Sequence, residues 1–152
     1  MTFNTAEQLP LLREPTADEW LGMAWWNALP DEDRLRWMQE AGGTGRVADA
    51  WAAFKHSIPA APAAALRAKT KTPVAVLREW HAHALQQATH HLDWARRTQG
   101  YLEAAQAQND ERTIDFYKRG VREHAEKAAY WFARVAEREE DFALRGVAVT
   151  DD

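Results

Sequence analysis

Two stretches in the second half of the chain place mostly apolar, small or aromatic residues at alternating spacings of three and four. The first runs over Leu77, His81, Ala84, Ala88, His91, Ala95, Thr98, Leu102 and Ala105. The second runs over Ile114, Tyr117, Val121, His124, Ala128, Trp131, Val135, Arg138 and Phe142. This spacing predicts helices that pack against each other along their length. Because the residues between the two stretches, Asn109 and Asp110, suit a tight turn, we predict a long antiparallel helical hairpin over residues 73–146 with its turn near 108–110.

The two stretches also complement each other in side-chain size. Aligning them about the turn pairs positions whose numbers add to about 219, which places Ala88 opposite Trp131 and Ala84 opposite Val135. Small side chains opposite large ones are what close packing requires. The same alignment places His91 and His124 in neighbouring layers, where we expect them to approach each other.

Three shorter helices are predicted before the hairpin. Thr16 and Glu19 match the capping-box pattern, which predicts a helix from there to about Leu29. A second helix starts after Pro30 and ends at the glycines 42–43. Apolar residues at 47, 50, 51 and 54 mark one face of a third helix.

These elements define an all-α fold class, a small three-helix N-terminal cap followed by the long hairpin. Residues 1–15 are predicted to form an N-terminal arm and 16–58 a Trp-rich helical cap. Residues 59–72, with two prolines, a run of alanines and a basic cluster, are predicted to be a linker, and 147–152 an acidic tail.

The composition excludes several classes of protein. Hydrophobic residues make up 46% of the 152 residues, which is enough for a real core, and the absence of cysteine excludes disulfides and thiolate metal sites. No segment has the apolar length of a membrane span, and residues 1–12 lack the features of a signal peptide. We therefore expect a cytoplasmic protein. The net charge of −4 has the wrong sign for a protein that depends on phosphate contacts, and only Arg67, Lys69 and Lys71 form a basic cluster, so nucleic acid is an unlikely partner.

Histidines are the first candidates for chemistry, because five of the six lie on the predicted hairpin arms. Imidazole pairs such as His91 and His124 can bind metal. Helical metal sites of the di-iron kind also use Glu-x-x-His pairs, and no glutamate stands three residues before any of these histidines. With no cysteine and no serine near a base, no nucleophilic arrangement is predicted. We expect no catalytic, cofactor or metal site.

Tryptophan is the most unusual feature of the composition, with eight in the chain. Five fall in the predicted cap, while Trp80, Trp94 and Tyr101 share one flank of the first hairpin arm. Either this flank receives the cap, or its rings are exposed anchors for a partner, since Trp and Tyr dominate interface hot spots. Trp25 and Trp26 are candidate partner-binding residues in the cap.

A strip of small residues on the outer side of the second arm also needs a covering surface. It is formed by Ala129, Ala133, Ala136 and Ala143, with Tyr130 beside it. A hairpin of two helices cannot bury a helix on every side, so the cap, a second copy or a foreign partner must cover this strip. We predict these five residues as a partner-binding surface.

The Trp-rich segment resembles a module of small uncharacterised helical proteins that proteobacterial plasmids, integrated elements and prophages encode. The residues that carry the resemblance are Asp18–Leu29, Arg34, Trp37, Ala41, Gly42 and Ala48–Lys55. The resemblance covers about a quarter of the chain and implies a mobile-element origin without implying an activity.

Three functions are compatible with these patterns. The first is a non-enzymatic interaction, accessory or regulatory protein that binds a protein partner or a second copy through its hairpin. The alternative is a nucleic-acid-associated oligomeric protein whose small head and hairpin resemble phage small terminase subunits. The second alternative is a histidine-dependent metal enzyme.

Overall fold

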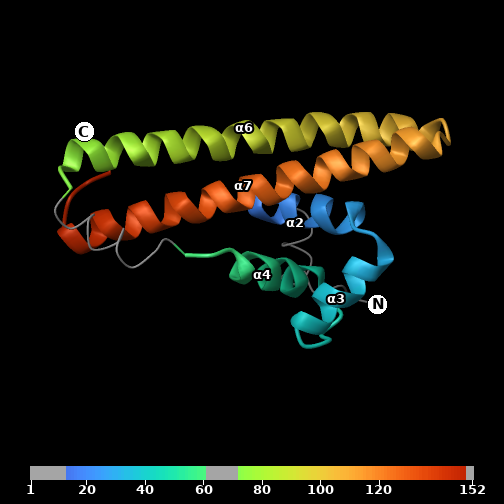
Figure 1. The fold of residues 1–152 in the computed structure, drawn as a ribbon, viewed down its shortest axis with the longest axis horizontal. Coiled ribbons are helices and arrows are strands. Elements are labelled where there is room, and N and C mark those ends of the chain that lie inside the picture. Colours follow the sequence, from blue (N-terminus) through green and yellow to red (C-terminus); the bar gives the residue numbers. More distant parts are fainter. Residues whose placement is uncertain (1–12, 61–71, 150–152) are drawn as a thin grey trace, which may run out of the picture.

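A computed structural model describes residues 13–60 and 72–149, and the described residues form helices and no strand. The helices are α2 (Ala17–Ala28), α3 (Asp31–Glu40), α4 (Val47–Ser57), α6 (Val74–Ala107) and α7 (Glu111–Arg145). Figure 1 shows α6 and α7 as a long hairpin with the three shorter helices on one side of it. The predicted all-α class with a three-helix cap and a hairpin is confirmed. Most of the predicted arm 1–15 and of the predicted linker 59–72, and half of the predicted tail 147–152, lie outside the described residues.

The helix ends form where the capping residues predict them. The backbone amide of Glu19 donates to the Thr16 hydroxyl at 3.1 Å at the start of α2. At the hairpin turn, Asn109 has a left-handed φ of 54°, and the Asp110 side chain accepts from the amide of Thr113. Gly146 closes α7 with a φ of 63°, a conformation that glycine adopts without strain. The turn at 108–110 is therefore confirmed.

The hairpin packs in the predicted register along its seam. Thr98 lies against Gly120, whose missing Cβ would come 3.0 Å from the Thr98 methyl carbon. Tyr101 contacts Tyr117, with ring centroids 5.5 Å apart. Each pair of residue numbers adds to about 219, as the size pattern predicted. Most of the predicted seam positions are buried or half-buried: on α6 Leu77, Ala84, Ala88, Ala95, Thr98, Leu102 and Ala105, and on α7 Val121, Ala128, Val135 and Phe142.

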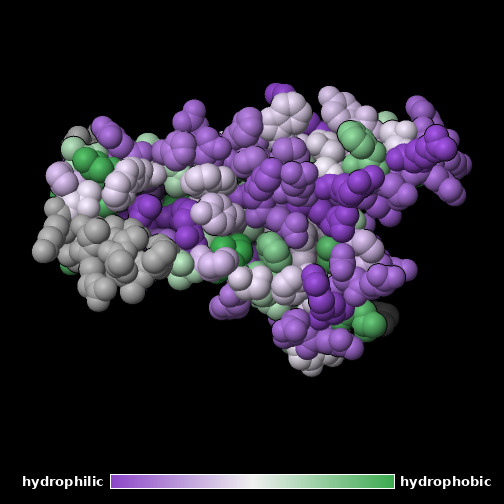
Figure 2. Space-filling view, viewed as in Figure 1, coloured by the Kyte–Doolittle hydropathy of each residue, from purple (hydrophilic) through white to green (hydrophobic). Residues whose placement is uncertain are grey.

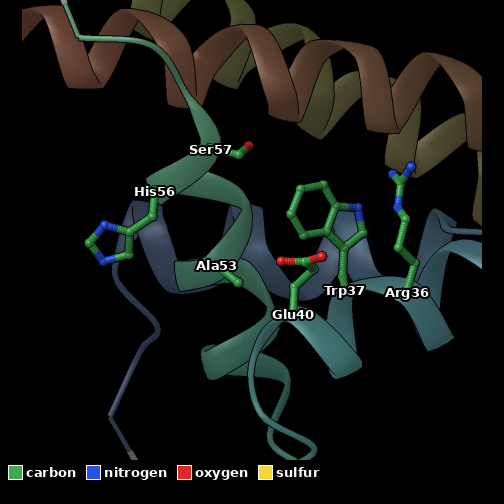
Figure 3. A pocket seen from close by; sticks show the side chains of 6 residues that line it. All are labelled: Arg36, Trp37, Glu40, Ala53, His56 and Ser57. Atoms are coloured by element: carbon green, nitrogen blue, oxygen red, sulfur yellow. The ribbon is translucent and has the colours of Figure 1, made fainter.

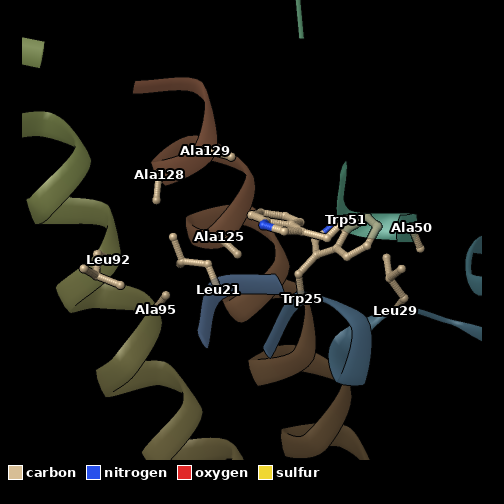
Figure 4. Close-up of a cluster of buried hydrophobic side chains, with 10 residues drawn as sticks. All are labelled: Leu21, Trp25, Leu29, Ala50, Trp51, Leu92, Ala95, Ala125, Ala128 and Ala129. Atoms are coloured by element: carbon tan, nitrogen blue, oxygen red, sulfur yellow. The ribbon is translucent and has the colours of Figure 1, made fainter. Parts of the chain in front are cut away.

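The cap and the hairpin share one hydrophobic core. α2 contacts α7 and α6 on one side and α4 on the other, while α3 packs on α4. Figure 4 shows Leu21 and Trp25 of α2 between Trp51 of α4 and the alanines of α7, of which Ala125 is fully buried. Small residues on α7 let α2 approach closely. In space-filling view, hydrophobic side chains show between the hairpin and α4, while hydrophilic ones prevail over the rest of the hairpin on this side (Figure 2).

Within the cap, glycine and aromatic rings fit together closely. A Cβ at Gly22 would lie 2.8 Å from the indole of Trp51, so only glycine allows this approach of α2 and α4. The Trp25 ring contacts Trp51, Trp37 and Phe54, at centroid distances of 5.2, 6.1 and 5.3 Å. These four aromatic residues all come from the predicted Trp-rich cap, so they stabilise the cap from within.

The cap does not cover the flank of α6 that carries Trp80, Trp94 and Tyr101. Cover of this flank by the cap was one of the two interpretations of its sequence. Trp80 and Trp94 are 42% and 39% exposed, and Tyr101 is 53% exposed. The cap packs instead where α7 presents Ala125, Ala128 and Ala129, because small side chains leave room for Leu21 and Trp25 at the hairpin surface. That sequence interpretation is therefore wrong, and the aromatic flank stays open.

Polar contacts tie the cap to itself and to the hairpin. The carboxylate of Asp18 accepts from the Trp51 indole at 3.1 Å and from Lys55 at 2.9 Å, which joins the first turn of α2 to α4. Arg122 of α7 forms an ion pair with Asp33 of α3 at 3.5 Å. These contacts fix the orientation of the cap while the shared apolar core supplies its affinity for the hairpin.

Candidate functional site

Exposed aromatic rings from both long helices gather on a face of the hairpin that the cap leaves open. We call this surface the aromatic face and define it by Trp80, Trp94, Tyr101, Phe116 and Tyr117. Phe116 is the most exposed of them at 65%. Tyr117 is half-buried and contacts the rings of both Tyr101 and Phe116. Large aromatic side chains left this exposed on neighbouring helices are typical of interaction surfaces.

A notch of about 460 Å³ interrupts the aromatic face where Thr98 of α6 lies against Gly120 of α7. Its floor is made of the small residues Thr98 and Gly120. Trp94 stacks on His124 at one end, with a centroid distance of 6.0 Å, and the pair of Tyr101 and Tyr117 forms the other end. Because its walls are rings and its floor is small, the notch has the shape that accepts one large apolar side chain.

Charged side chains border the notch on the α7 side. Arg119 and Glu123 both line it and are separated by one helical turn. Glu123 also pairs with Lys127 at 2.9 Å, and this ion pair holds the pKa of the Glu123 carboxyl below its usual range. The notch therefore combines an apolar interior with a rim that carries both signs of charge, as protein-binding surfaces do.

His91 and His124 meet beside the notch, as the seam alignment predicted. Their Nδ1 atoms are 3.2 Å apart and their rings are stacked. One neutral imidazole donates its proton and the other accepts it, so only one of the two Nδ1 atoms is protonated in this pair. Burial is the main reason that the pKa of each histidine is lowered, and for His91 the neighbouring imidazole of His124 is the next cause.

Mild acid is expected to destabilise the fold through this pair. The unfolded chain has an ordinary histidine pKa of 6.5, and the folded values lie below it, so the unfolded state binds more protons as the pH falls. The stability that the neutral pair contributes is complete above pH 6.5 and is lost as the pH falls through the folded pKa values. Thermal unfolding followed by circular dichroism at about pH 7.5 and about pH 5 measures this loss as a lower melting temperature in acid.

The matched variant is His124→Gln, which removes one titrating ring and keeps a hydrogen-bonding group. Its melting temperature should fall less between the two pH values than that of the wild type. Glu126 also contributes to the pH dependence, because burial raises its pKa and its protonation therefore favours the folded state in acid. This contribution is the same in both proteins, so it cancels in the comparison. An equal fall in both proteins would contradict the prediction.

A second hollow lies in the cap, between α3 and α4. It has a volume of about 630 Å³ and is lined by Arg36, Trp37, Glu40, Ala53, His56 and Ser57. Figure 3 shows the His56 ring pointing away from the Ser57 hydroxyl. That hydroxyl donates to the carbonyl of Phe54. The hollow therefore does not bring a nucleophile and a base together.

The residues predicted to bind a partner do not form one surface. Trp25 is fully buried, and Ala129 is 4% exposed under the cap, so both are removed from the predicted surface. Trp26 is half-buried with the Arg34 guanidinium 5.7 Å from its ring centre. Ala133 is half-buried, whereas Tyr130, Ala136 and Ala143 are exposed.

The sequence interpretation missed Phe116 and Gly120, which complete the notch. The signals were present: Phe116 is an apolar residue outside the seam spacing, and Gly120 interrupts a long helix opposite Thr98. A glycine inside a helix commonly marks a close approach of another element.

The described residues contain no group of three or more histidine, aspartate or glutamate side chains placed to hold a metal ion. Within the same residues, no helix has the length and apolar character that a membrane crossing requires. The chain matches no protein-family model, no curated protein and no solved structure. The resemblance of the Trp-rich segment to mobile-element proteins stays a prediction.

Proposed function

We propose that this chain is a non-enzymatic protein-binding module whose working surface is the aromatic face of the α6–α7 hairpin. The observation that supports this most is that Trp94, Tyr101 and Phe116 remain exposed beside a notch although the chain has a cap that covers another side of the same hairpin. Aromatic side chains offer large contact areas with few rotatable bonds, so they lose little entropy on binding.

The rest of the chain fits a supporting role. The hairpin is stiff because its two helices pack along about 50 Å, which follows from 34 residues in α6 at about 1.5 Å each. The cap packs on one side of the hairpin and stabilises it through the shared core. A protein partner agrees better than nucleic acid with the net charge of −4, because phosphate binding depends on basic residues.

A photoreactive amino acid tests this function directly. p-Benzoylphenylalanine in place of Phe116 is expected to form a covalent adduct with a protein when the chain is irradiated in extract of its host. The same amino acid in place of Leu35, which is 62% exposed on α3, is the matched control and should form none. Mass spectrometry identifies the captured chain.

Substitution then measures the contribution of the rings. Trp94→Ala is expected to weaken binding of the captured protein at least about tenfold, as loss of an interface hot spot does, while Leu35→Ala leaves it unchanged. Adducts at Leu35 with none at Phe116 would contradict the proposal, as would binding that Trp94→Ala does not alter.

A further inference from the structure

A row of exposed charges runs along α7 beside the notch, and its order has a specific symmetry. The row consists of Asp115, Arg119, Glu123 and Lys127, which lie four residues apart and alternate in sign. All four are exposed. Residues four apart form one ridge on a helix, and helices commonly pack along such ridges.

The alternation makes this ridge complementary to itself. When a second copy of α7 lies antiparallel with the two-fold axis at the level of residue 121, Arg119 of each copy faces Glu123 of the other. In the same arrangement Asp115 faces Lys127. Every acid therefore meets a base, and a two-fold axis repeats each pair twice. An antiparallel foreign helix would have to carry the same alternation of charges at the same spacing of four residues to match the ridge equally well.

The shape of the notch agrees with this arrangement. Arg119 and Glu123 line the notch, so a helix that pairs with them lies over it. The antiparallel register carries Phe116 of each copy toward the end of the other copy's notch that Trp94 and His124 form. Phe116 is the most exposed ring of the aromatic face and has a large apolar side chain, the kind that the notch accepts.

We infer that the partner of the aromatic face is a second copy of this chain, bound antiparallel through α7 with Phe116 of each copy in the notch of the other. This inference rests on the proposed function, because it names the occupant of the same surface. The interface holds both rings and exposed charges, as reversible protein–protein interfaces do, so we expect monomer and dimer to exchange.

Charge reversal and its compensation test the inference. Sedimentation equilibrium of the full chain between about 1 and about 200 μM should show wild-type dimers in this concentration range. Arg119→Glu and Glu123→Arg should each weaken the dimer about tenfold, since the two-fold axis places like charges together twice. The double variant should recover most of the wild-type affinity. Glu140→Arg, an exposed reversal outside the ridge, is the control and should change nothing.

Each contrary result has its own meaning. A wild-type monomer over the whole range, or a double variant as weak as the single ones, overturns the antiparallel dimer. If the Phe116 photoadduct is then a different protein, the dimer is wrong and the proposed function stands. If Phe116 captures no protein at all, both are wrong. Binding of a single-stranded oligonucleotide that needs Arg119 and Trp94 also overturns both. Circular dichroism of each variant verifies that these exposed substitutions leave the fold intact.

Discussion

Replacing Ala125 by arginine is expected to lower the free energy of unfolding by about 3–5 kcal/mol, as an uncompensated buried charge does. Ala125 is fully buried where α2 packs on α7, in the core that Leu21 and Trp25 complete. A long charged side chain has no room there, so the cap must separate from the hairpin to give it water. Urea unfolding followed by circular dichroism measures the change.

The matched control is Ala136→Arg, the same substitution three turns further along the same helix. Ala136 is exposed, so the change in unfolding free energy should stay within about 0.5 kcal/mol. The comparison also bears on the predicted alanine surface. Equal and small effects at both positions would mean that the cap does not pack on α7. If Ala136→Arg alone changed the oligomeric state of the protein, the predicted partner-binding surface would hold at this end of the alanine strip.

The fold could be predicted from sequence because its decisive signals are local and repeated. The seam spacing on both arms, the Asp110 cap and the closing Gly146 each report on neighbouring residues. The complementary sizes of Ala84 and Val135 even predicted the register. Helices that pack lengthwise repeat the same contact several times, so an error at one position leaves the others correct.

The docking side of the cap could not be predicted in the same way. Trp80 and Trp94 are apolar and share one flank of α6. Their spacing is compatible both with burial under the cap and with exposure to solvent. What decides is shape: α2 carries Leu21 and Trp25, which need a shallow surface, and Ala125 and Ala129 supply it. Such a preference depends on two helices that are far apart in sequence, and no periodicity reports it.

Only part of the candidate site could be predicted from the sequence, because the rest also depends on how two distant helices pack. Trp94 and Tyr101 were identified as possible anchors, whereas the notch depends on the close approach of Thr98 to Gly120. A cavity is a property of the backbone distance between two helices. Spacing along one helix does not contain that distance.

Trp25→Ala is the second substitution with a large expected effect, about 3–5 kcal/mol of lost unfolding free energy. The Trp25 ring is fully buried and contacts rings from α3 and α4, so its removal leaves a cavity that several surrounding rings would have to fill. Because these neighbours are themselves held by packing, the cavity cannot close completely.

Trp80→Ala is the matched control, the same change at a ring that is 42% exposed on the aromatic face. Its main loss is the contact with Arg138, whose guanidinium lies 5.1 Å from the ring centre, and the expected cost is about 1 kcal/mol. Urea unfolding followed by circular dichroism compares the two variants without depending on indole fluorescence. Equal costs would contradict the core position of Trp25. If Trp25→Ala lowered the unfolding free energy only slightly but abolished binding of the captured protein, Trp25 would belong to the partner-binding surface that the sequence predicted.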